Sequence, residues 1–234
     1  MRYKQIIDRL TALANPEAVA GMARFGINPN NTLGVSIPAL RAIAKEIGKD
    51  HALAEQLWAS GIHEARILAG FIDVPGMVSE EQMERWVVDL DSWDVCDQCC
   101  GSLFDKTPFA YTKAIEWSER SEEFVKRAGF ALMAALAWHD KRAADEQFAP
   151  FFPALVRGAT DERNFVKKAV NWALRQMGKR NANLNRLAIE TAREIQRIDS
   201  RAARWIASDA LRELTSEQVQ RRLGGQVVEP LERS

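Results

Sequence analysis

Apolar residues recur at helical spacing along nearly the whole chain. This spacing places them on one face of a helix, whereas a half-buried strand needs alternating positions. Because no convincing alternating run of β-branched residues occurs, the pattern predicts an all-α protein. Asn15, Ser36 and Thr107 each precede a proline by one or two residues, as at helix starts. Ser79 and Thr215 each precede a glutamine by three residues, the spacing of a capping box.

The helical segments also repeat one another. Phe-Val-Lys-Arg-Ala at 124–128 matches Phe-Val-Lys-Lys-Ala at 165–169 at an offset of 41 residues, and the surroundings of Trp172 match those of Trp205 at an offset of 33. Helical repeats of roughly 40 residues are typical of HEAT-like or armadillo-type solenoids, in which antiparallel helix pairs bury their apolar faces against their neighbours. We therefore predict an α-solenoid with a concave face suited to a long ligand.

The length of 234 residues allows one elongated unit or two small domains. We predict a single HEAT-like repeat domain over residues 1–223 and a flexible tail over residues 224–234, which begins with two glycines. The composition, 47% hydrophobic and 27% charged, excludes disordered and fibrous classes. No run of about 18 apolar residues occurs, so we expect a cytoplasmic protein with no membrane partner.

A carboxylate stands out in the helix expected over residues 91–104. Asp97 follows Trp93 by one turn and shares its helix face with apolar residues. An unpaired charge buried there would cost several kcal/mol. Asp97 is therefore either a solvated or salt-bridged acid at the rim of a helix interface, or a functional residue. Ser92 and Asp94 lie where an N-cap and a first-turn acid are expected and need no functional explanation.

Cys96, Cys99 and Cys100 lie on the same expected helix. A structural zinc site normally needs four ligands, but the chain has no second cysteine pair and its histidines are scattered. An odd number of cysteines also does not fit a secreted disulfide framework. We expect small buried core residues, with a redox role of the Cys-x-x-Cys pair as the alternative, and no cofactor.

The net charge is zero, which alone argues against a nucleic-acid partner. Charges are nevertheless segregated along the chain: residues 163–186 hold seven basic residues and no acid, whereas residues 73–97 hold eight acids and one arginine. A basic stretch of this kind could follow a phosphate backbone. The candidate DNA-binding residues within it are Lys167, Lys168, Arg175, Lys179 and Arg180.

Two residues of the repeat helices have a structural and a functional interpretation. Trp172 shares a helix face with Lys168 and Arg175, so its indole either fills a repeat interface or lies against a sugar or base. Arg127 keeps its charge and needs an anionic partner, which would be Asp97 or a DNA phosphate. The spacing leaves both interpretations open.

Three segments together resemble a known family. Ser-Trp-Asp-Val-Cys-Asp at 92–97, Phe-Val-Lys-Arg-Ala at 124–128 and Phe-Val-Lys-Lys-Ala-Val-Asn-Trp-Ala-Leu-Arg at 165–175 are similar to segments of the AlkD family of DNA alkylation-repair glycosylases. Members of that family are HEAT-like solenoids. The resemblance keeps the same order over roughly residues 15–215. Three matches in order are far more specific than any one of them.

The resemblance implies an enzyme that hydrolyses the N-glycosidic bond of N3- and N7-alkylated purines in duplex DNA, without a base-specific pocket. It also implies an active surface made of four residues: Trp93, Asp97, Arg127 and Trp172. An alkylated purine is already cationic and leaves readily, so the difficult step creates an oxocarbenium-like sugar. On this hypothesis Asp97 stabilises that cation and positions water, the tryptophans hold the deoxyribose, and Arg127 clamps a phosphate.

The chain departs from the family pattern at residues 19–25, which read Val-Ala-Gly-Met-Ala-Arg-Phe and lack the tyrosine expected in this region. Some relatives keep the solenoid without glycosylase activity and bind unusual DNA structures. Three hypotheses follow: an alkylpurine DNA glycosylase, a non-catalytic binder of unusual or damaged DNA, and a HEAT-type protein-interaction scaffold. We favour the first, acting as a monomer on double-stranded DNA with alkylated bases.

Overall fold

The computed structural model describes residues 2–224, which contain helices and no strand. The all-α prediction is therefore confirmed. The helices divide into two compact units, unit 1 (Met1–Ala110) and unit 2 (Tyr111–Ser234). A single repeat domain over residues 1–223 stays a prediction, and residues 225–234 of the expected tail lie outside the described residues. Across residues 2–224, every helix is too short or too polar to span a membrane.

The helices of unit 1 are α1 (Tyr3–Ala12), α2 (Pro16–Arg24), α3 (Ile37–Ile47), α4 (His51–Ala59), α5 (His63–Ile72), α6 (Glu80–Val88) and α7 (Trp93–Ser102), with 3-10 turns at Pro75–Met77 and Phe104–Lys106. The helices that follow are α8 (Ala110–Ser118), α9 (Glu123–His139), α10 (Asp145–Phe148), α11 (Phe151–Gly158), α12 (Asn164–Gly178), α13 (Ala182–Gln196), α14 (Arg201–Leu214) and α15 (Glu217–Arg222).

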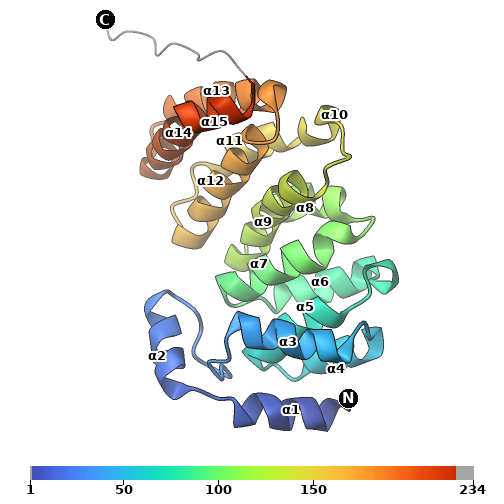
Figure 1. The fold of residues 1–234 in the computed structure, drawn as a ribbon. Coiled ribbons are helices and arrows are strands. Elements are labelled where there is room, and N and C mark those ends of the chain that lie inside the picture. Colours follow the sequence, from blue (N-terminus) through green and yellow to red (C-terminus); the bar gives the residue numbers. More distant parts are fainter. Residues whose placement is uncertain (1, 225–234) are drawn as a thin grey trace, which may run out of the picture. The chain divides into compact units, whose positions relative to one another are not determined.

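The core of unit 1 forms where α5 packs against α3, α4 and α7 (Figure 1). Two indoles stack beside it, Trp58 of α4 on Trp86 of α6, with ring centroids 4.1 Å apart and planes only 5° from parallel. Both side chains are buried. Aromatic side chains of this size bury more apolar surface than any others, so they contribute strongly to the stability of the unit that carries α7.

Unit 2 confirms the 41-residue repeat in three dimensions. α9 packs along α12 (Figure 1), and the equivalent residues Phe124 and Phe165 stack with ring centroids 5.5 Å apart. The second offset differs, because α12 begins at Asn164 and α14 at Arg201, a period of 37 residues. The predicted match of Trp172 with Trp205 at an offset of 33 is therefore wrong by four residues. Four residues make about one helical turn, so a match displaced by four residues still lies on the same helix face. Apolar spacing in the sequence therefore does not distinguish an offset of 33 from one of 37.

A residue caps the start of a helix when its side chain accepts a hydrogen bond from a backbone N–H in the first turn of that helix. Three predicted caps form in this way, at Asn15, Ser36 and Ser79. The predictions at Thr107 and Thr215 are wrong because the helices that follow begin later than the spacing predicts, α8 at Ala110 and α15 at Glu217. Ser216 caps α15 instead of Thr215.

Candidate functional site

α7 carries both candidate residues of unit 1. It runs Trp93–Ser102, shorter than the predicted residues 91–104, because Leu103 leaves the helical conformation and a 3-10 turn follows. Trp93 is its first residue, and Asp97 lies one turn later on the same side. Both side chains are half-buried, while Val95 and Cys96 between them are fully buried. Asp97 therefore lies at the rim of the core, where solvent reaches it.

The loop between α2 and α3 holds the start of α7 in place. Trp93 Nε1 donates to the Phe25 carbonyl at 3.2 Å. Asn28 makes two further bonds, from its backbone N–H to Ser92 Oγ at 2.9 Å and from Nδ2 to Asp91 Oδ2 at 2.7 Å. Ser92 occupies the expected N-cap position, but its hydroxyl serves this tertiary contact and does not cap α7. These bonds fix the orientation of the Trp93 indole.

Glu64, on α5, binds the loop between α2 and α3 from the interior of unit 1. The side chain is completely buried, and its carboxylate accepts from the backbone N–H groups of Leu33, Gly34 and Val35 at 2.9, 2.6 and 3.2 Å. Hydrogen bonds from backbone N–H groups to a carboxylate are short and strong, so these three bonds hold the loop firmly. Sequence analysis missed Glu64, because its segment has the ordinary pattern of an amphipathic helix and nothing in it marks the acid as buried.

His63 and Asp94 form a buried pair beside the candidate residues. Nε2 of His63 lies 2.9 Å from Oδ2 of Asp94, and the two residues are 4% and 9% exposed. Burial opposes protonation of His63, but the hydrogen bond and charge of Asp94, with the charges of Glu64 and Asp91, raise its pKa overall. Asp94 does lie in the first turn, as predicted, yet its role is this tertiary pair with α5, which sequence analysis did not find.

The cysteines of α7 are core residues, as predicted. Cys96, Cys99 and Cys100 are completely buried and form no disulfide. Burial raises the pKa of the Cys99 and Cys100 thiols well above the ordinary value. Because the thiolate is the reactive form of cysteine, these environments suit packing and argue against the redox alternative.

Unit 2 carries the other two candidates on the neighbouring helices α9 and α12. Arg127 is only 5% exposed, and its Nη1 donates to the Phe165 carbonyl at 2.7 Å. That bond joins α9 to the first turn of α12. The sequence predicts that Arg127 clamps a phosphate, but its guanidinium is less accessible than that role requires. Trp172, in the middle of α12, is half-buried, so part of its indole is open to solvent.

The predicted basic stretch on α12 is partly neutralised by α14. Arg175 Nη1 lies 2.9 Å from Asp209 Oδ2, and Lys179 Nζ lies 2.7 Å from Glu213 Oε1. Each of these acids lies 34 residues later in the chain than its partner. The charge segregation seen along the sequence therefore does not hold in space, because α14 packs against α12 and brings acids to it.

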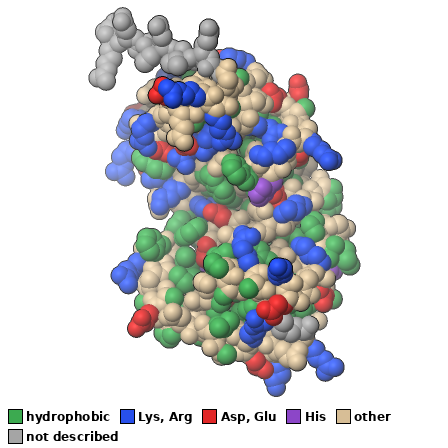
Figure 2. Space-filling view, viewed as in Figure 1, with side chains coloured by type: hydrophobic (Ala, Val, Ile, Leu, Met, Phe, Trp, Pro, Cys, Tyr) green, Lys and Arg blue, Asp and Glu red, His purple; other side chains and the backbone are tan. Residues whose placement is uncertain are grey.

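The other three predicted DNA-binding cations are Lys167, Lys168 and Arg180, which differ from Arg175 and Lys179 in their surroundings. Lys168 is exposed, Lys167 Nζ lies 5.1 Å from the centre of the Trp205 ring, and Arg180 donates to backbone carbonyls. None of the three has a carboxylate within ion-pair distance in that part of the chain. Figure 2 shows lysine and arginine side chains gathered on unit 2, with fewer acids among them on the face shown.

Comparisons with known proteins agree with the repeat architecture. Residues 6–214 match the model of a family described as DNA alkylation repair enzyme. One solved structure, described as "a new family of proteins related to the HEAT-like repeat DNA glycosylases with affinity for branched DNA structures", is 22% identical, with 97% of each chain covered and a TM-score of 0.77. A designed armadillo repeat protein in complex with a (KR)4 peptide is 14% identical over 80% of this chain and 79% of its own, with a TM-score of 0.40. No curated protein sequence matches the chain. The first structure shows that the fold is HEAT-like.

Proposed function

The chain belongs to the DNA alkylation repair enzyme family, and we propose that it is a DNA glycosylase that removes N3- and N7-alkylated purines from duplex DNA. The observation that carries the proposal is the half-buried Asp97, one turn after a half-buried Trp93 on α7. An acid at this position can reach a substrate. The indole beside it is held by the Phe25 carbonyl, so the two side chains keep a fixed spacing.

The proposed reaction needs no cofactor. The bond between C1′ and the purine nitrogen breaks, and its electron pair leaves with the purine, which departs as a neutral base because it began as a cation. The deoxyribose becomes oxocarbenium-like, and the Asp97 carboxylate stabilises this positive charge. Water then bonds to C1′ and gives its proton to Asp97, which leaves an abasic sugar in the strand.

The other candidates hold the substrate or the helices around it. Trp93, beside Asp97 on α7, presents an indole face to the cationic deoxyribose. Trp172 presents a half-buried indole on α12 that contacts DNA within unit 2. Arg127 is nearly buried and bonded to the Phe165 carbonyl, which favours a positioning role over a phosphate clamp. Lys167 and Lys168 form no ion pair with a carboxylate within residues 2–224, and they contact the DNA backbone. Selectivity comes from the leaving group, since a cationic purine departs more easily than a neutral one.

Release of free bases tests the proposal. Duplex DNA treated with a methylating agent is incubated with the protein, and 7-methylguanine and 3-methyladenine are measured by liquid chromatography. The proposal predicts release of both bases from methylated DNA and none of normal bases from untreated DNA. Absence of release by protein that binds the same duplex contradicts it.

A non-catalytic binder of branched DNA is the second candidate. It is favoured by the similar solved structure, whose protein is described as having affinity for branched DNA, and by the ion pairs of Arg175 and Lys179 with α14. This function predicts tighter binding to a four-way junction than to a duplex at equal salt, with no base release. The interaction scaffold, in contrast, predicts no salt-dependent affinity for either DNA.

A further inference from the structure

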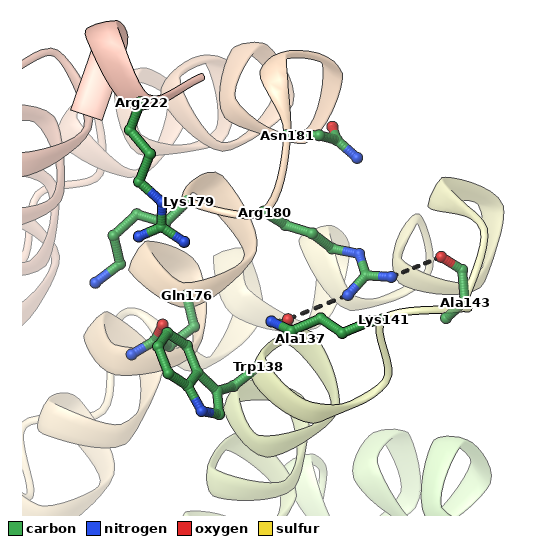
Figure 3. A pocket seen from close by; sticks show the side chains of 9 residues that line it. All are labelled: Ala137, Trp138, Lys141, Ala143, Gln176, Lys179, Arg180, Asn181 and Arg222. Carbon is green, nitrogen blue, oxygen red and sulfur yellow. Dashed lines mark hydrogen bonds between the residues drawn. The ribbon is translucent and has the colours of Figure 1, made fainter. Parts of the chain in front are cut away.

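A cavity of about 240 Å³ opens in unit 2 beside the C-terminal ends of α9 and α12 (Figure 3). Trp138 forms part of its wall, and none of the described residues that line it is acidic. Trp138 lies eleven residues after Arg127 on α9, about 16 Å along the helix axis at about 1.5 Å per residue. Four cations line this cavity: Lys141, Lys179, Arg180 and Arg222.

Two of these cations have structural partners. Helix C-termini attract cations because their last carbonyls lack partners within the helix. Arg180 serves this need, since it donates to the carbonyls of Ala137 and Ala143 at 3.2 and 2.7 Å. Lys179 pairs with Glu213 of α14. Helix capping and ion pairing therefore account for the positions of Arg180 and Lys179. Within residues 2–224 the guanidinium of Arg180 meets carbonyl oxygens and the Phe148 ring, 4.6 Å from its centre, and forms no ion pair with a carboxylate.

Lys141 and Arg222 have no such explanation. Lys141 Nζ lies 4.9 Å from the centre of the Trp138 ring, and within residues 2–224 neither cation pairs with a carboxylate or donates to a carbonyl through its side chain. Figure 3 shows Arg222 reaching toward the cavity from α15, opposite the Trp138 indole. Cations that converge on one cavity repel one another unless an anion lies between them.

Trp138 supplies the second element of a nucleotide site. Its side chain is 50% exposed, unlike the buried Trp58, Trp86 and Trp117. An exposed indole next to uncompensated cations is the combination by which proteins hold nucleic acid without reading its sequence: the cations neutralise phosphates, and the ring packs against a sugar or base.

We infer that this cavity binds a phosphate of a DNA strand, with Trp138 packed against the adjoining sugar or base. Lys141 and Arg222 neutralise the phosphate, and Arg180 adds a fixed positive charge on the far wall. The inference rests on the proposed function, because its occupant is DNA. It assigns a DNA contact to Trp138, Lys141 and Arg222, which neither the family resemblance nor the basic stretch includes.

Salt dependence of DNA binding tests the cavity. The double variant Lys141→Gln/Arg222→Gln removes its two uncompensated cations, and the control Arg193→Gln/Arg197→Gln removes two exposed cations of the same unit outside it. The slope of log affinity against log salt should become shallower by about 1–2 in the first variant only, since each phosphate contact contributes about 0.9. An unchanged slope, or an equal change in the control, overturns the inference.

Cross-linking locates the contact without altering any cation. Gln176 lines the cavity, and Gln176→Cys introduces a thiol there, whereas the native cysteines are completely buried. DNA with an activated disulfide tether on a phosphate should cross-link to this variant and not to Gln196→Cys, at an exposed residue of α13. Equal cross-linking of the two overturns the inference. If the parent protein does not bind DNA, the proposed function is overturned as well. If the parent binds DNA and excises alkylated bases while the salt-dependence and cross-linking tests are both negative, only the inference about the cavity is overturned.

Discussion

His63 Nε2 lies 2.9 Å from Asp94 Oδ2 in the interior of unit 1. Asp94 is in the first turn of α7 and precedes Asp97 by three residues, so the pair ties α5 to the helix that carries the proposed catalytic acid. A polar pair buried in this way orients the first turn more strictly than apolar packing, because a hydrogen bond has a preferred direction. The placement of Trp93 and Asp97 therefore depends on His63, a nearly buried residue of a different helix.

The contribution of His63 to stability should depend on pH. Its pKa is raised in the folded protein above the ordinary 6.5, so the folded state holds the proton more tightly than the unfolded state. The contribution of protonated His63 to the free energy of unfolding is therefore fully present below pH 6.5 and is lost as pH rises through the raised pKa of the folded state. We expect Asp94→Asn to lose more unfolding free energy, relative to the parent, at about pH 5 than at about pH 9. Urea denaturation at both pH values measures this; equal losses would contradict the pairing.

Replacement of Glu64 should destabilise unit 1 strongly. Glu64→Gln replaces an ionised carboxylate, which accepts three backbone bonds, with an amide that accepts through one oxygen. Buried N–H groups left without partners predict a loss of about 3 kcal/mol. Glu17→Gln, at an exposed acid of α2, should cost less than about 1 kcal/mol. Chemical denaturation of both variants provides the comparison, and similar losses would show that Glu64 does not hold the loop.

Two glycines should respond to alanine with opposite signs. A Cβ on Gly129 of α9 would lie 2.4 Å from the backbone nitrogen of Ser118 on α8, so Gly129→Ala forces the helices apart and should cost about 1–3 kcal/mol. A Cβ on Gly21 of α2 meets nothing within 4 Å. Gly21→Ala should therefore stabilise the protein by about 0.5–1 kcal/mol. Thermal melting of both variants tests whether α8 and α9 pack this closely.

Trp172→Ala should weaken DNA binding more than it lowers stability. The indole is half-buried, and loss of one stacking contact is worth about 1–3 kcal/mol of binding free energy, or about 5- to 150-fold in affinity. Fluorescence anisotropy with a labelled duplex measures the affinity, and differential scanning calorimetry measures the melting temperature. A large fall in melting temperature with unchanged affinity would assign Trp172 to the repeat interface.

Features that depend on local sequence were predictable. Helical spacing, caps such as Asn15 and the 41-residue repeat are set by neighbours in the chain, and the stacked Phe124 and Phe165 confirm the repeat. The burial of the cysteines also followed from their small size and apolar surroundings. The Thr107 and Thr215 caps failed because α8 and α15 begin later in the chain than the spacing predicts.

Features that depend on which helices are neighbours were not predictable. Asp209 and Glu213 neutralise Arg175 and Lys179 only because α14 lies against α12. The burial of Glu64 likewise depends on a loop about 30 residues away in the sequence, whose backbone N–H groups it accepts from. Charge counted along a solenoid sequence therefore overestimates its binding surface, since each repeat supplies counter-charges to the previous one.

The rate of 7-methylguanine release under single-turnover conditions tests the central claim most directly, in a comparison of the parent with Asp97→Asn and Asp8→Asn. Asparagine keeps the shape of aspartate and removes its charge, and Asp8 is an exposed acid of α1 that serves as the control. The account predicts a rate at least about 100-fold lower for Asp97→Asn, with unchanged DNA affinity and melting temperature, and a parental rate for Asp8→Asn. Equal rates for the parent and Asp97→Asn would contradict the assignment of Asp97 as the carboxylate that stabilises the sugar cation and accepts the proton of water.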